Sequence, residues 1–218
     1  MGIKENVSRI LSEIPKEVIL VAAVKYANIE QIKELVEAGV TELGFNTYQQ
    51  MVDVKQAMPG KVLSNVNFHF IGHLQSNKVR KVMKLGTSLI QSIDSYHLAE
   101  KMQLVGEEEG LFQDILVQVK TDDAKEYGIP PLELEEFLLR LKELDHLSIR
   151  GLMTIPHVEK NPEDARKYFA KMSGLFEKSC GILGTQLDYL SMGMSDDYKI
   201  AIEEGANMIR LGRILFKD

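Results

Sequence analysis

The sequence predicts an α/β fold in which eight parallel strands alternate with helices and close into a single (β/α)8 TIM barrel. Apolar, strand-like runs alternate with amphipathic helical stretches, and eight such runs can be counted. The chain has 218 residues, and one barrel of this kind needs roughly 200 to 250. A doubly wound open sheet is the alternative, because the same order of elements can build it.

An unbroken apolar run near the N-terminus predicts the first strand. The run extends from Val18 to Val24 and is followed by Lys25. Strands that are apolar at every position are typical of parallel sheets covered on both faces. The expected strands lie at residues 18–25, 41–46, 67–72, 88–94, 114–120, 148–154, 188–192 and 208–212.

Helices are expected between these strands, at residues 29–38, 48–56, 78–84, 96–107, 132–144, 162–178 and 198–204. Gly39, Gly86 and Gly205 each follow a helical stretch and precede a strand, and glycine tolerates the left-handed conformation that ends a helix. Pro162 suits the first turn of a helix. The charged stretch 120–131 predicts a long loop after the fifth strand. No linker or shift in composition divides the chain, so we expect one domain over residues 1–218.

Composition narrows the classes of function. The net charge of −6 argues against a nucleic-acid partner, which requires a cationic face. Cys180 is the only cysteine, which rules out an internal disulfide and a cysteine-rich zinc site. His69 and His73 straddle a strand and its loop, so we expect no metal site. The sequence shows neither a signal peptide nor a membrane span, and a cytoplasmic protein is expected.

Lys25 ends the first predicted strand, and residues at the C-terminal ends of barrel strands face the active-site mouth. A partly desolvated amine loses the stabilisation of its charged form and becomes nucleophilic toward a carbonyl. Together with a late phosphate-type loop, this lysine predicts a Schiff base with a phosphorylated aldehyde, pyridoxal 5′-phosphate (PLP). The alternative is an ordinary strand-end lysine that extends into solvent.

The last two predicted strands are followed by candidate phosphate-binding loops. Barrels frequently bind phosphate with the loops after their seventh and eighth strands. Met194 and Ser195 precede a predicted helix, and Gly212 allows a close approach of the backbone. Arg210 lies in the eighth strand, where its donor-only guanidinium would keep the pyridine nitrogen of the cofactor unprotonated and weaken it as an electron sink. A structural arginine paired with a buried carboxylate is the alternative.

Several motifs resemble those of the pyridoxal phosphate homeostasis protein family, in order and over nearly the whole chain. They are Ala23-Val24-Lys25, Gly44-x-Asn46, His69 to Lys78, Ser92 to Ser95, Gly151 to Pro156 and Leu190 to Asp197. The resemblance implies a barrel like the N-terminal domain of alanine racemase, with PLP on Lys25 and Arg210 facing the pyridine nitrogen. The expected cofactor-binding residues are Lys25, Asn46, His69, Ser92, Met153, Ser191, Met194, Ser195, Arg210, Gly212 and Arg213.

The resemblance also implies a function. Family members are regarded as carriers or regulators of PLP without established turnover, so we expect a role in PLP homeostasis or delivery and no catalytic residue. The expected partners are PLP and PLP-dependent apoenzymes, and we expect a monomer. Two alternatives remain, a racemase-like PLP enzyme and a class I aldolase-type enzyme that needs no cofactor. Racemases of the related fold add a second β domain, for which this chain leaves no length.

The chain departs from the family pattern in three places, which are the segment around Asn46, Arg213 and the C-terminal end. Phe45 and the Thr47-Tyr48 pair alter the segment around Asn46, where glutamate usually stands in place of Phe45. Arg213 replaces the usual serine or threonine, and we expect its charge to offset the lost hydroxyl contact with phosphate. The chain stops at residue 218, short of the usual tail, so the last helix is expected to be missing or the barrel poorly sealed there.

Overall fold

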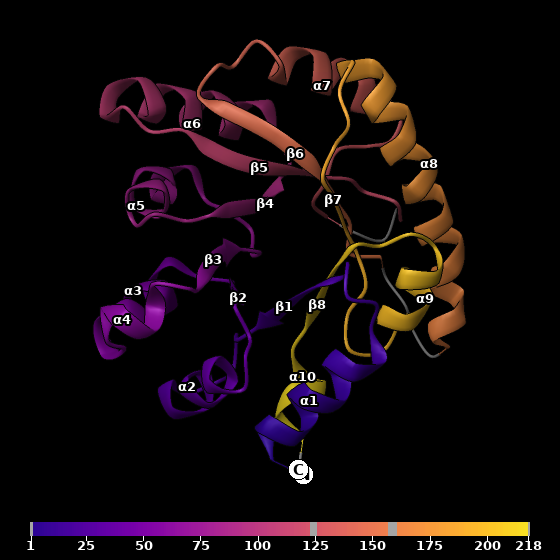
Figure 1. Ribbon diagram of the computed structural model, residues 1–218. Coiled ribbons are helices and arrows are strands. Elements are labelled where there is room, and N and C mark those ends of the chain that lie inside the picture. The colour runs from indigo at the N-terminus through magenta and orange to yellow at the C-terminus, as the bar shows by residue number, and fades with distance from the viewer. Residues whose placement is uncertain (1, 123–125, 157–160, 218) are drawn as a thin grey trace.

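The computed structural model describes residues 2–122, 126–156 and 161–217. Within them, parallel strands form one closed barrel in chain order from β1 to β8, which confirms the predicted barrel and excludes the open sheet. Figure 1 shows the strands at the centre with helices around them. The strands are β1 (Ile19–Ala23), β2 (Glu42–Phe45), β3 (Asn67–Phe70), β4 (Leu89–Ile93), β5 (Gln113–Gln118), β6 (Leu147–Met153), β7 (Tyr189–Ser191) and β8 (Met208–Leu211).

All the predicted helices are present, although the segment predicted at 162–178 divides into a 3-10 turn and a longer helix. The helices are α1 (Ile3–Glu13), α2 (Ile29–Glu37), α3 (Tyr48–Ala57), α4 (Gly60–Leu63), η1 (Ser76–Lys78), α5 (Val79–Lys84), α6 (Tyr96–Glu109), α7 (Leu134–Leu141), η2 (Pro162–Ala165), α8 (Arg166–Leu183), α9 (Tyr198–Glu203) and α10 (Arg213–Phe216). In the part of the chain that the structure describes, no helix is both long and apolar enough to cross a membrane.

Local sequence accounts for many element boundaries. Asn28, Thr47 and Ser95 precede α2, α3 and α6, and each side chain accepts a hydrogen bond from a backbone N–H in the first turn of the helix. The three predicted glycine stops are confirmed, with φ values of 97° at Gly39, 74° at Gly86 and 98° at Gly205. These caps and glycine residues fix where the helices begin and end, which hydrophobic periodicity alone does not specify.

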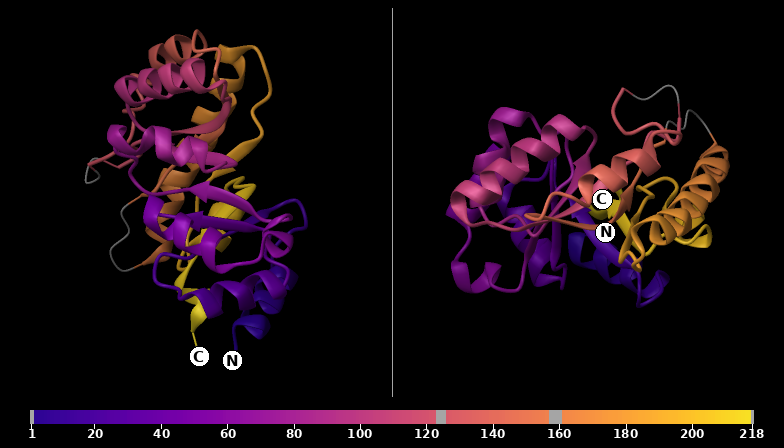
Figure 2. Two further views of the ribbon diagram at one scale, coloured as in Figure 1. Left: turned by 90° about the vertical axis from the view of Figure 1, so that its left-hand side faces the viewer. Right: turned by 90° about the horizontal axis from the view of Figure 1, so that it is seen from above.

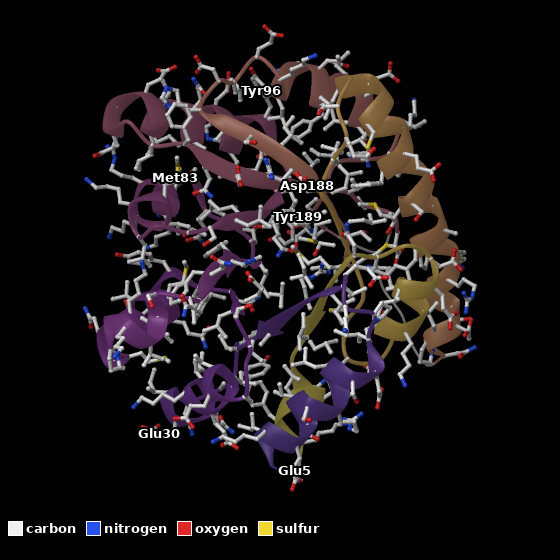
Figure 3. The ribbon with its side chains drawn as sticks, viewed as in Figure 1. Glu5, Glu30, Met83, Tyr96, Asp188 and Tyr189 are labelled. Carbon is white, nitrogen blue, oxygen red and sulfur yellow. The ribbon has the colours of Figure 1, made fainter. Side chains whose placement is uncertain are left out.

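The core has two layers. The larger apolar layer lies between the strands and the surrounding helices, and a smaller one fills the barrel interior. Tyr189, labelled near the middle of the ring of strands in Figure 3, packs against the inner layer. The buried members of the inner layer are Val21, Leu89, Leu116, Met153 and Met208. Burying such side chains stabilises the fold by about 1.5–3 kcal/mol each.

The end of the chain corrects one expectation. α10 follows β8 directly and contacts α1, so the last helix is present although it is short. The Asn6 amide on α1 donates hydrogen bonds to the carbonyl oxygens of Leu215 (3.4 Å) and Lys217 (2.7 Å). Both views in Figure 2 show the two termini side by side. The barrel is closed here, since β8 pairs with β1 and α10 packs against α1.

The segment after β5 folds back on its strand. The backbone N–H of Ile129 donates to the Gln118 carbonyl (2.8 Å), and that of Lys120 donates to the Ile129 carbonyl (2.9 Å). The predicted loop at 120–131 therefore begins and ends beside β5, while its residues 123–125 lie outside the described residues.

Candidate functional site

A cavity of about 1180 Å³ opens at the C-terminal ends of the barrel strands. Residues at the ends of β1, β2, β6, β7 and β8 line it, as expected for a barrel mouth. Among the predicted site residues, those in its wall are Lys25, Asn46, Met194, Ser195, Arg210, Gly212 and Arg213. The fold therefore brings together the predicted amine and the two predicted phosphate loops.

Lys25 lies two residues beyond β1 and is exposed at the cavity. Its Nζ lies 5.0 Å from the centroid of the Tyr26 ring. The expectation of a partly desolvated amine is wrong for this structure, because β1 ends at Ala23 and leaves Lys25 outside the buried strand. The amine nevertheless faces the cavity, where a bound carbonyl compound can reach it.

Arg210 is the buried cation of the site. It is the third residue of β8, only 4% exposed, and contributes to the cavity wall. Its Nη1 donates to the Ser191 hydroxyl (2.6 Å) and its Nη2 donates to the Thr154 carbonyl (2.7 Å). Burial lowers the pKa of Arg210 to about 10, and the charge of Asp197 opposes this shift. The guanidinium therefore stays protonated at neutral pH.

The partners of Arg210 test the alternative expectation for this residue, a structural arginine paired with a buried carboxylate. Both groups that accept its hydrogen bonds are neutral, and no carboxylate among the described residues forms an ion pair with it. Asp197 acts on it only through longer-range charge. The two contacts use one N–H group on each terminal nitrogen, out of the five N–H groups that a guanidinium carries.

The loops after β7 and β8 meet at Ser195. Its hydroxyl oxygen accepts hydrogen bonds from the backbone N–H groups of Gly212 (3.3 Å) and Ile214 (3.4 Å). These two N–H groups and the hydroxyl converge at one side of the cavity, as an anion site requires. Gly193 permits this arrangement because its φ is +93° and an added Cβ would lie 2.6 Å from the Cβ of Ala201.

Met194 belongs to a candidate phosphate-binding loop, but its backbone N–H donates to the Asp197 carboxylate (2.6 Å). Burial raises the pKa of Asp197 above its ordinary value. This hydrogen bond and the charge of Arg210 oppose the increase but do not cancel it. Ser195 and the amides around Gly212 are therefore the donors that remain for an anion.

Arg213 lies at the rim of the cavity and pairs with Asp196. The two side chains are 68% and 65% exposed. We expected the Arg213 side chain to replace a hydroxyl in binding the phosphate. In the structure Asp196, from the same loop region, competes with the phosphate for this side chain.

Four predicted site residues, His69, Ser92, Met153 and Ser191, are buried and do not line the cavity. Met153 belongs to the inner apolar layer, and Ser92 Oγ has no hydrogen-bond partner among the described residues. His69 and Ser191 form hydrogen bonds with other side chains in the barrel interior. None of the four lies in the cavity wall, and their direct contact with a ligand stays a prediction.

Several lining residues were not predicted, including Tyr26, Gln31, Pro162 and Lys217. Tyr26 follows β1 and Gln31 lies in the first turn of α2, where proximity to Lys25 was an available signal. Pro162 and Lys217 reach the cavity only because η2 and α10 fold over it.

Phe45, a departure from the family pattern, points away from the site. It is fully buried and packs against Phe68, with ring centroids 4.7 Å apart. Asn46, the next residue, lines the cavity. Alternation along the strand thus places the substitution in the core and leaves the wall residue in place. Among the described residues, no three His, Cys, Asp or Glu side chains gather as metal ligands.

Comparison with known proteins assigns the family. The profile described as alanine racemase, N-terminal domain, matches residues 2–218. A pyridoxal phosphate homeostasis protein of Aquifex aeolicus is 34% identical over 229 residues, covering 100% of this chain and 99% of the relative. One from Synechocystis is 37% identical over 212 residues, covering 97% and 96%. The chain belongs to the pyridoxal phosphate homeostasis protein family.

Solved structures agree with this assignment. PipY of Synechococcus elongatus, determined with PLP bound, matches this pyridoxal phosphate homeostasis protein family member with a TM-score of 0.92 and 31% identity, over 99% of this chain and 100% of PipY. Alanine racemase of Clostridium difficile shares 15% identity with a TM-score of 0.81, covering 100% of this chain and 56% of the racemase. The racemase likeness shows the shared fold alone.

Proposed function

We propose that this chain binds PLP in the cavity at the barrel mouth, holds it as a Schiff base on Lys25, and serves cytoplasmic PLP homeostasis as a single-domain carrier rather than as an enzyme. The observation that carries the proposal is the convergence of Lys25, Arg210 and Ser195 on one cavity. The names of its relatives and the PLP-bound PipY structure support it.

The residues present fit the cofactor. The cavity of about 1180 Å³ is ample for a ligand of this size, since small-molecule sites typically measure about 300–1,000 Å³. Ser195 Oγ and the N–H groups of Gly212 and Ile214 would hold the phosphate in place of their present mutual contacts. Arg210 would donate to the pyridine nitrogen with the N–H groups that Ser191 and Thr154 do not use.

Bound PLP would supply an aldehyde, and Lys25 Nζ is the amine that would hold its carbon covalently, with loss of the aldehyde oxygen as water. Arg210 remains protonated and donates only, so it keeps the pyridine nitrogen unprotonated and disfavours carbanion chemistry. These properties suit storage and delivery of the cofactor, with PLP-dependent apoenzymes as the recipients.

The test is borohydride reduction of the PLP-loaded protein followed by peptide mapping. The phosphopyridoxyl mass should appear on the peptide that contains Lys25. The Lys25→Ala variant should lose the label and the visible absorbance while keeping the circular dichroism of the fold, because Lys25 is exposed and contributes little packing. A label found chiefly on Lys78 or Lys120, or no label at all, would contradict the proposal.

A further inference from the structure

A continuous chain of polar side chains crosses the barrel interior beneath the cavity. Arg210 Nη1 lies 2.6 Å from Ser191 Oγ, which lies 2.7 Å from Gln91 Oε1. Gln91 Nε2 lies 2.8 Å from His69 Nδ1, and His69 Nε2 lies 2.7 Å from the Glu42 carboxylate. The chain links β8, β7, β4, β3 and β2, and Gln91 at its centre is completely buried.

Hydrogen-bonding capacity gives this chain a single direction. Arg210 can only donate, so Ser191 accepts a hydrogen bond from it and donates its own hydroxyl to Gln91 Oε1. The Gln91 amide nitrogen then donates to His69 Nδ1 and to the Met208 sulfur (3.3 Å). His69 Nδ1 must therefore accept, which leaves the proton on Nε2, where it is donated to Glu42. In this arrangement His69 accepts at Nδ1 and donates from Nε2.

The opposite orientation of the Gln91 amide does not satisfy the same partners. Its NH2 group would then donate to Ser191, whose own hydroxyl proton would lose its acceptor, and its oxygen would face the Met208 sulfur and require a proton on His69 Nδ1. Burial raises the pKa of the Glu42 carboxyl, but its interactions with His69, Asn67 and Thr41 together lower the pKa overall. An anion at one end and a guanidinium at the other polarise the intervening bonds in the same direction.

We propose that Gln91 is a positioning residue that orients the Arg210 guanidinium in the cofactor cavity by acting through Ser191; this inference rests on the proposed PLP function. Of the two acceptors that hold Arg210, the Thr154 carbonyl belongs to the backbone, whereas the Ser191 hydroxyl can rotate. Gln91 Oε1 accepts the Ser191 proton and thereby directs the serine lone pair toward Arg210.

The decisive variants are Gln91→Leu, Ser191→Ala and the double variant. Gln91→Leu should shift the absorbance maximum of the bound cofactor and raise its Kd by about tenfold, the effect of 1.4 kcal/mol. If Gln91 acts through Ser191, the Kd of the double variant for PLP should not exceed the higher of the two Kd values of the single variants. Gln91→Glu retains an acceptor for Ser191 and should restore most of the affinity.

Gln113→Leu is the matched control. Gln113 is also a buried glutamine of a barrel strand, but its amide donates to the carbonyl oxygens of Thr87 and Asp114, outside the chain. It should leave the spectrum and Kd unchanged. A folded Gln91→Leu protein with the parent spectrum and Kd, or additive losses in the double variant, would overturn the proposal.

Nitrogen-15 NMR of the cofactor-free protein tests the hydrogen-bonded chain of side chains without relying on PLP binding. His69 should give the signature of a neutral ring protonated on Nε2, and Gln91→Glu should convert it to an imidazolium, since both ring nitrogens then face carboxylates. A proton on Nδ1 in the parent protein would overturn the assigned direction. If the parent failed to bind PLP, the proposed function would fail, and the NMR result would still decide whether the chain exists.

Discussion

The two arginines at the cavity are held in very different ways. Arg210 is buried and contacts two groups of the barrel interior, whereas Arg213 is 68% exposed and pairs with the equally exposed Asp196. A buried, doubly anchored guanidinium can define the orientation of a ligand. An exposed one contributes mainly a screened charge.

Arg213→Ala is therefore expected to raise the Kd for PLP by less than about fivefold, in line with the roughly 0.2–1 kcal/mol of an exposed ion pair. Titration of cofactor-free protein by fluorescence measures this. Arg213→Thr, which restores the family hydroxyl, serves as the comparison. If Arg213→Ala raised the Kd by more than about tenfold, equivalent to 1.4 kcal/mol, and Arg213→Thr did not, the Arg213 side chain would be shown to hold the phosphate.

Among the elements, α1 and α9 are tied together by charged groups. The Glu13 carboxylate at the end of α1 accepts from Tyr198 (3.0 Å) and pairs with Lys199 (3.0 Å) on α9 and with Arg9 (3.2 Å). Hydrogen bonds from Lys199, Tyr198 and Arg9, in that order, lower the pKa of Glu13 to about 2 from its ordinary 4.5.

This shift predicts an acid dependence of stability. A carboxyl whose pKa is lower in the folded state contributes stability above its unfolded pKa and loses it as the pH falls. The difference in Tm between the parent and Glu13→Gln should therefore be constant above about pH 5 and shrink as the pH falls toward 2. Glu177→Gln, on an exposed position of α8, is the control. A Tm difference that does not change with pH would contradict the role assigned to Glu13.

At the scale of the whole molecule, the barrel interior combines an apolar layer with a polar chain that ends at Arg210. The arrangement holds a permanent cation against the proposed position of the pyridine ring. It favours retention of the cofactor over stabilisation of a carbanion.

Free amino acids should consequently be turned over very slowly or not at all. Incubation of the PLP-loaded protein with L-alanine in deuterated water should give no rapid incorporation of deuterium at the α-carbon, as followed by proton NMR. An alanine racemase run in parallel provides the positive control. Incorporation at about 1 s⁻¹ or faster, the range of ordinary enzymes, would favour the racemase-like alternative.

Much of the fold was predictable because local sequence carries its own periodicity and boundaries. Each of the eight strands lies within or one residue from its predicted range, and Gly39, Gly86 and Gly205 have the backbone conformation expected of helix stops. The short helix α10 was missed because its stability depends on contacts with α1 rather than on its own four residues.

The site was predictable in part for a related reason. Lys25, Ser195 and Gly212 follow strand ends, and parallel strands in a barrel bring all such ends to one mouth. The same argument included His69 and Ser191, and it does not reveal that they form hydrogen bonds with other side chains in the barrel interior.

Short-range pattern and the geometry of parallel strands specify the alternation of strands and helices, the caps between them, and several of the residues that meet at the mouth. The exposure of Lys25, the pairing of Arg213 with Asp196 and the partners of Gln91 became evident only in the folded chain. Those features depend on which side chains face each other across the closed barrel. Gln91 and Ser191 are 100 residues apart in the chain, and closure of the ring alone brings them within 2.7 Å.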